Sequence, residues 1–174
     1  MKTISINLYA FNELSETAKE KALQTLSDIN VDFGWWDFIY EDAKEIGLDL
    51  SGFDLHRDIK CEGEFILDAK EVAQNIVNNH GEKTDTFFAA FNFLDYVEPL
   101  LADYMNEDSY RYENIHLGNE IMNLETSFLN KLLKLYFKIL QSEYNYLTSE
   151  QAIIEAIESN DYFFTENGEL YKNK

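Results

Sequence analysis

Basic residues, cysteine and proline are scarce in this sequence. Its 174 residues include one cysteine, one proline and seven glycines, and 14 Lys and Arg stand against 33 Asp and Glu. The single Cys61 excludes an intramolecular disulfide and fits a reducing compartment. Because the single Pro99 leaves no Pro-rich linker, we expect one domain that spans residues 1–174.

Long apolar runs are also missing. No run approaches the roughly 20 residues that a membrane helix requires. The opening residues, MKTISINLYAFNELSE, lack a charged segment followed by a long apolar one, which is the pattern of a secretion signal. We therefore expect a cytoplasmic protein that does not bind a membrane.

The shortage of basic residues gives the chain a formal net charge of −19. Its hydrophobic fraction of 45% and aromatic fraction of 15% are too high for a disordered acidic tail, so the sequence predicts a folded protein. A charge of this size repels nucleic acid and acidic membranes. Direct binding to nucleic acid is therefore not expected.

Apolar periodicity and capping residues predict a largely helical body. Ser15 is a good N-cap for the first helix. Asp68 with Glu71, and Thr148 with Gln151, have the spacing of capping boxes that open two later helices. The expected helices cover residues 16–29, 35–46, 69–79, 84–104, 119–146 and 148–159.

The fourth of these helices carries apolar residues at helical spacing and an internal proline. Pro99 is expected to kink this helix or to start a new one. The polar, Tyr-rich segment 106–116 that follows is expected to be a loop. The apolar residues of the helix are Phe87, Phe88, Phe91, Leu94, Val97, Leu101 and Tyr104.

Alternating segments predict the strands. Ile4, Ile6 and Leu8 alternate with polar residues, which predicts a strand with one buried face. Residues 48–67 predict a β-hairpin with a bulge at Gly52, and the turn dipeptide Asn167-Gly168 predicts a second hairpin over 161–171. The expected fold is α+β, with a mostly helical body packed on a small antiparallel sheet.

Residues that carry common chemistry do not cluster in the sequence. His56, His80 and His116 are far apart and Cys61 has no second cysteine, so we expect neither a metal nor another cofactor. Cys61 lies on the apolar face of its predicted strand, where a thiol is inert. The glycines are isolated, and with 33 acids a carboxylate pair has no specificity. The sequence therefore does not predict an enzyme.

The first third of the chain concentrates acidic residues near an aromatic one. Acids repeat every four residues on the helix over 35–46, which places carboxylates about 6 Å apart along one face. Others populate the following hairpin. This pattern predicts either a solvated acidic face or a patch that binds a basic groove of a partner. The candidate residues are Trp35, Asp37, Glu41, Asp42, Glu45, Asp49, Asp54, Asp58, Glu62 and Glu64.

A second candidate lies in the segment 106–116. Tyr110, Arg111 and Tyr112 combine the residue types that are enriched at binding hot spots. These tyrosines either bind a partner or fold back onto the helical body.

Three segments carry a resemblance to known proteins. The phrase FNELSETAKEKA at 11–22, the segment WWDFIYED at 35–42 and the ending NDYFFTENG at 160–168 resemble a largely uncharacterised group of small acidic proteins of phages and prophages. The resemblance covers roughly the first 80 and the last 15 residues. Small acidic phage proteins often inhibit host defence, as anti-CRISPR and anti-restriction proteins do.

The resemblance implies an anti-CRISPR-like inhibitor in the cytoplasm of a host bacterial cell. Its partner would be a defence nuclease, such as a CRISPR effector, that is blocked by nucleic-acid mimicry or by another route. The alternatives are an antitoxin-like partner of a basic toxin and an anti-restriction DNA mimic. The sequence does not separate them, and it leaves the oligomeric state open.

Overall fold

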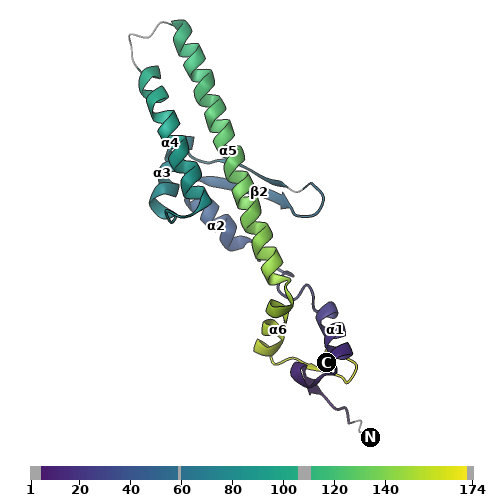
Figure 1. Ribbon diagram of the computed structural model, residues 1–174. Coiled ribbons are helices and arrows are strands. Elements are labelled where there is room, and N and C mark those ends of the chain that lie inside the picture. Colours follow the sequence, from purple (N-terminus) through teal and green to yellow (C-terminus); the bar gives the residue numbers. More distant parts are fainter. Residues whose placement is uncertain (1–4, 59, 106–110, 172–174) are drawn as a thin grey trace. The chain divides into compact units, whose positions relative to one another are not determined.

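The computed structural model describes residues 5–58, 60–105 and 111–171 and forms two compact units (Figure 1). Unit 1 comprises Met1–Trp35 and Ser142–Lys174, and unit 2 comprises Trp36–Gln141. The expectation of one domain stays a prediction, because compactness alone does not establish whether the units fold together.

Unit 1 is built from segments far apart in the sequence. Its elements are β1 (Tyr9–Ala10), the short 3₁₀ helix η1 (Phe11–Glu13), α1 (Glu16–Thr25), α6 (Glu150–Ser159) and β4 (Phe163–Phe164). β1 and β4 pair antiparallel, with Tyr9 opposite Phe164. The rings of Phe11 and Phe164 meet edge to face at 6.2 Å. The core of unit 1 consists of Phe11, Leu14, Ala18, Ala22, Ile153, Ile157 and Phe164.

The ends of unit 1 differ from the sequence-based expectation. Ile6 and Leu8 are 58% and 37% exposed, so the predicted buried face is wrong for them, and Ile4 lies outside the described residues. From residue 5 onwards, the strand at this end comprises only Tyr9–Ala10. The C-terminal segment returns on itself through a bridge between Phe164 and Leu170, and Gly168 adopts φ +76° at the predicted turn. β1 therefore forms because it pairs with the distant β4, and not because apolar and polar residues alternate in its own sequence.

Helix starts in unit 1 follow local hydrogen bonds. The Ser15 hydroxyl accepts the backbone N–H of Ala18, as predicted, although α1 ends at Thr25 and not at residue 29. α6 is capped by Ser149, whose hydroxyl accepts the N–H of Ala152. The predicted cap at Thr148 is wrong by one residue, because the Thr148 hydroxyl donates backwards to the Tyr144 carbonyl.

Unit 2 packs a hairpin against helices. Its elements are α2 (Asp37–Glu45), β2 (Leu48–Asp54), β3 (Lys60–Phe65), α3 (Ala69–Asn79), α4 (Asp85–Tyr104) and α5 (Arg111–Leu147), of which residues up to Gln141 belong to this unit. α4 and α5 lie side by side, and α5 passes in front of the hairpin in Figure 1. The stacked rings of Phe93 and Phe128, 4.4 Å apart, join these two helices.

The hairpin is two-faced. Leu48, Leu50 and Cys61 are buried, whereas Asp49, Glu62 and Glu64, which alternate with the inward-facing residues, are exposed. The ladder register shifts between Leu50 and Gly52, which confirms the predicted bulge. A side chain at Gly63 would collide with the Asp49 carbonyl and approach Leu133 of α5, so the helix lies close over this strand. The inner face therefore belongs to the core and the outer face remains open.

Three expectations for unit 2 need correction. Of the two alternatives for Pro99, the start of a new helix is wrong, because α4 continues through Pro99 to Tyr104, and the kink stays a prediction. Residues 111–116 belong to α5, and the expected loop is wrong for them, because the helical backbone begins at Arg111. Asp68 occupies the N-cap position of α3 but makes no side-chain capping hydrogen bond.

The fold class is α+β, as the sequence predicts. The hairpin over 48–67 is confirmed as β2–β3. Within the described part of the chain, the strands form two separate two-stranded sheets instead of one.

Candidate functional site

Like charges face each other on the exposed side of the hairpin. Asp49 of β2 stands directly opposite Glu64 of β3 in the antiparallel ladder, and both side chains are exposed. Glu62 projects from the same face, about 6.6 Å along the strand from Glu64. Carboxylates directly opposite each other destabilise a sheet. We call Asp49, Glu62 and Glu64 the hairpin acids.

The tip of the hairpin is partly neutralised. The ammonium group of Lys60 lies 2.8 Å from Glu62 and 3.5 Å from Asp58. The hydrogen bond to Glu62, followed by the charges of Glu62 and Asp58, raises the pKa of Lys60. None of the ion pairs among the described residues involves Asp49 or Glu64. The negative charges of this cross-strand pair are therefore not compensated by any ion pair among the described residues.

Asp54 shapes the turn of the hairpin. Its Oδ1 accepts the backbone N–H groups of Arg57 at 2.9 Å and His56 at 2.8 Å. These bonds, led by the one from Arg57, lower the pKa of Asp54. The carboxylate thus has a local structural role, and its role in binding stays a prediction.

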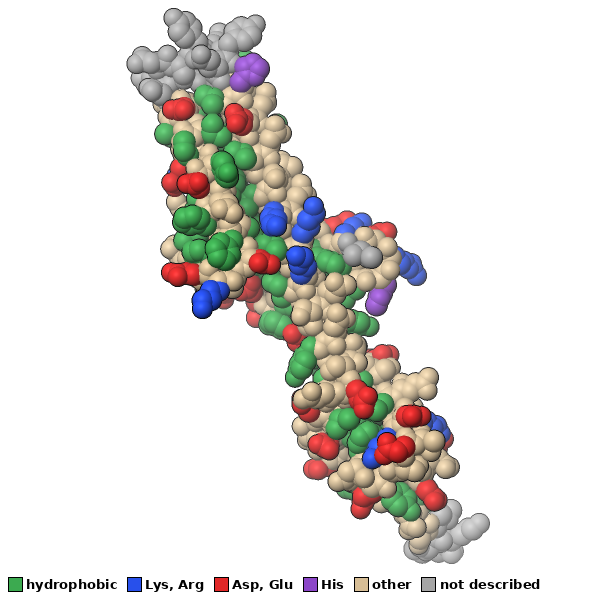
Figure 2. Space-filling view, in the orientation of Figure 1, with side chains coloured by type: hydrophobic (Ala, Val, Ile, Leu, Met, Phe, Trp, Pro, Cys, Tyr) green, Lys and Arg blue, Asp and Glu red, His purple; other side chains and the backbone are tan. Residues whose placement is uncertain are grey.

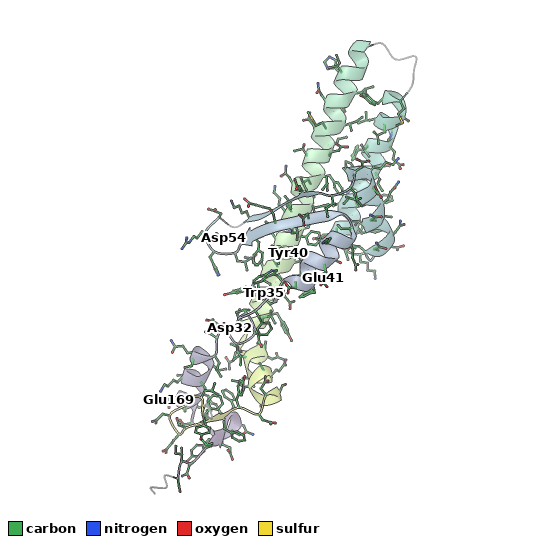
Figure 3. All side chains as sticks on the ribbon, turned by 180° about the vertical axis from the view of Figure 1, so that it is seen from behind. Asp32, Trp35, Tyr40, Glu41, Asp54 and Glu169 are labelled. Carbon is green, nitrogen blue, oxygen red and sulfur yellow. The ribbon has the colours of Figure 1, made fainter. Side chains whose placement is uncertain are left out.

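The acids of α2 form a second exposed row. Asp37, Glu41 and Glu45 are exposed, while Ile39 and Ala43 on the opposite side are buried, as the sequence predicts. α2 packs against the hairpin next to Asp54, since the ring of Phe53 lies 5.6 Å from that of Trp36 and 6.3 Å from that of Tyr40. Figure 3 labels Glu41 on the helix and Asp54 on the hairpin.

Asp42 has contacts that its position in the sequence did not indicate. Its Oδ2 accepts a hydrogen bond of 2.7 Å from the hydroxyl of the fully buried Tyr136. Its Oδ1 lies 3.7 Å from Nε2 of His80, whose Nδ1 is 2.8 Å from the Thr86 hydroxyl. Burial first, and then the bond to Asp42, raises the pKa of Tyr136. Asp42 therefore joins α2 to the core and is only in part a surface acid.

Comparison of the chain with models of protein families, with curated proteins and with solved structures finds no match. Function has to be argued from the residues themselves.

The structure describes only one of the aromatic candidates. Trp35 belongs to unit 1, where its ring lies 5.8 Å from that of Tyr144. Tyr110 lies outside the described residues, as do the side chains of Arg111 and Tyr112. Their part in binding a partner stays a prediction.

An acidic pair that the sequence did not single out lies at the base of the hairpin. Burial raises the pKa of Glu125 on α5, and the charge of Asp68, just after β3, raises it further. The residues are far apart in the chain, so only the tertiary fold indicates their interaction. No sequence signal would have identified the pair.

Three further features of the fold concern other functions: the cysteine, clusters of metal-binding side chains, and long apolar helices. Cys61 is buried, and this burial raises the pKa of its thiol to about 11, which keeps it protonated at neutral pH. Within residues 5–58, 60–105 and 111–171, no cluster of three His, Cys, Asp or Glu side chains has the arrangement of a metal site. No described helix is both long and apolar enough to cross a membrane.

Proposed function

We propose that this chain is a binding protein that inhibits a bacterial defence nuclease through the hairpin acids. The partner is an RNA-guided CRISPR effector, whose basic groove normally holds a nucleic-acid backbone. The hairpin acids occupy that groove and exclude the nucleic acid. This proposal extends the resemblance to small phage proteins, and its support from the structure is the arrangement of Asp49 and Glu64.

The pairing of Asp49 with Glu64 is the observation that carries the proposal. Such a pair costs about 0.2–1 kcal/mol relative to a neutral one, and either residue could be replaced without disturbing the buried face. A destabilising surface pair is expected where function requires the charge. The pair also lies on an open face of regular structure, where its geometry is fixed by the ladder.

A basic groove would gain from this arrangement in two ways. Long-range attraction between opposite charges accelerates encounter, and the effect weakens as salt rises. A cation of the partner placed between Asp49 and Glu64 would also remove their mutual repulsion. This relief of repulsion stabilises only the complex, because the cation is present only when the partner is bound.

The test measures inhibition of DNA cleavage by the CRISPR effector of the source bacterium. Asp49→Lys together with Glu64→Lys is compared with Glu20→Lys together with Glu166→Lys, a pair of exposed acids in unit 1. Both double variants change the net charge equally. We expect the hairpin variant to lose about tenfold or more in affinity and the control to lose about threefold or less.

Stability measurements complete the test. The single substitution Glu64→Lys should raise the free energy of unfolding by about 0.2–1 kcal/mol while it weakens inhibition. Equal losses of affinity in the two double variants would mean that only net charge matters and would contradict a site on the hairpin. Absence of binding to the effector would refute the proposed partner.

A further inference from the structure

Three phenylalanines form an aromatic cluster on α4 outside the core. The buried stripe of this helix is Thr86, Ala90, Phe93 and Val97. Phe88 and Phe91 lie off that stripe and are 53% and 54% exposed. Figure 2 shows hydrophobic side chains gathered along this helix between acidic ones. We call Phe87, Phe88 and Phe91 the α4 aromatic cluster.

The three rings form one continuous surface. Phe87 stacks on Phe91 at 6.2 Å with an angle of 13° between the rings, and it meets Phe88 edge to face at 6.0 Å. Single exposed apolar residues are normal on a protein surface, whereas a contiguous aromatic patch marks an interaction site. The ring contacts restrict the side chains before any partner arrives, which reduces the conformational freedom lost on binding.

Acidic residues flank the cluster on the same helix. Asp85 precedes Phe88 by three residues and Asp95 follows Phe91 by four, which places each beside an exposed ring. Both acids are exposed, and no ion pair among the described residues includes them. Glu98, one turn further, is paired with Lys70 at 3.4 Å. The apolar surface therefore lies between two available carboxylates.

This charge pattern selects the kind of occupant. A second copy of the chain would bring another net charge of −19 to the same surface, and an acidic membrane or a nucleic acid would also be repelled. An amphipathic helix with an apolar stripe and flanking Lys or Arg fits both the rings and the carboxylates. We propose that the α4 aromatic cluster is a docking site for a basic amphipathic helix of a partner protein. This docking site goes beyond the proposed function, since it includes neither Asp49 nor Glu64.

The binding test uses the full chain and a synthetic helical peptide built from Leu and Lys at amphipathic spacing. Its controls are a peptide of the same composition in scrambled order and an amphipathic peptide of Leu and Glu. Titration calorimetry should show binding of the amphipathic basic peptide at least about tenfold tighter than of the scrambled one. Equal affinity for the two basic peptides would overturn the proposal, because charge alone would explain it.

Substitutions test whether the peptide binds at the α4 aromatic cluster. Phe88→Ser with Phe91→Ser should weaken binding of the amphipathic peptide about tenfold or more, whereas Ile139→Ser, at a side chain on α5 that is 41% exposed, should leave it unchanged. Asp95→Lys should weaken binding and reduce its salt dependence. Circular dichroism confirms that each variant is folded, and Phe88→Leu with Phe91→Leu, which keeps an apolar surface, should retain most of the affinity.

Two further results would overturn the proposal. One is unchanged affinity in the folded Phe88→Ser, Phe91→Ser variant. The other is a self-associated full chain in sedimentation that the same variant converts to monomer, since the occupant would then be a second copy. Asp49→Lys with Glu64→Lys should leave peptide binding largely unchanged, so failure of the hairpin proposal and failure of this one are distinguishable.

Discussion

The hydroxyl of Tyr136 on α5 donates a hydrogen bond of 2.7 Å to Oδ2 of Asp42 on α2. Tyr136 is fully buried, whereas the side chain of Asp42 is 51% exposed. The bond therefore gives a buried hydroxyl a charged acceptor that keeps part of its hydration.

Tyr136→Phe should lower the free energy of unfolding by about 1.5 kcal/mol, the low end for a hydrogen bond to a charged group, because the exposed carboxylate regains water. Urea unfolding measures the change. Asp37→Asn, at an exposed acid on the same helix, should change stability by less than about 0.5 kcal/mol. A Tyr136→Phe protein as stable as the native chain would contradict the assigned bond.

Cys61 should make the fold sensitive to alkaline pH. Its pKa is raised from 9.0 to about 11 by burial, so the folded state keeps a proton that the unfolded state loses. Below pH 9 the thiol is protonated in both states, and its contribution to stability is complete. Between pH 9 and 11 the free energy of unfolding should fall by roughly 1 to 2 kcal/mol from this group.

Cys61→Ala removes this titrating group and should flatten the decline in stability over that pH range. Urea unfolding at pH 8, 9, 10 and 11 measures the difference between the two proteins. Parallel pH profiles for native protein and variant would show that the thiol does not contribute.

Ser149, and not the neighbouring Thr148, caps the N-terminus of α6. Ser149→Ala should destabilise the protein by about 1 kcal/mol, because the N–H of Ala152 loses its capping acceptor. Thr148→Ala should cost less, since its hydroxyl donates to a carbonyl at the end of α5 and caps nothing. Thermal unfolding compares the two variants, and the reverse order of stability would place the cap at Thr148.

Asp161 occupies a backbone conformation that favours glycine. Its φ is +51°, and its N–H and that of Tyr162 bond to the carbonyls of Glu158 and Ile157, which ends α6 in a Schellman motif. Asp161→Gly should therefore stabilise the protein by up to about 1 kcal/mol. Asn160→Gly, at φ −98°, should give no gain. Equal effects at the two positions, measured by urea unfolding, would contradict this explanation.

Features with local causes were predictable from the sequence. Ser15 marks the start of α1 because its hydroxyl bonds three residues ahead, and the hairpin with its bulge follows from alternation interrupted by Gly52. The exposed row of acids on α2 follows from spacing of four residues along a helix.

Features that depend on tertiary partners were not predictable. Phe87 and Phe91 repeat at helical spacing as regularly as Phe93 and Val97, so periodicity alone does not tell which stripe of α4 is buried. Asp49 faces Glu64 only because the bulge between Leu50 and Gly52 changes which residues of the two strands lie opposite each other on that side of it. The contact of Asp42 with Tyr136 requires two helices to pack, and no local pattern encodes it.

Because β1 pairs with β4, unit 1 can be completed only late in synthesis on the ribosome. Tyr9 emerges early, but its partner Phe164 is translated only after the whole of unit 2. Because domains fold as their residues emerge, the segments of unit 2 are complete while Phe11, Leu14 and Ala18 still lack the covering residues Ile153, Ile157 and Phe164. The nascent chain thus carries an uncovered apolar segment through most of translation, which is the period when a chaperone would bind it.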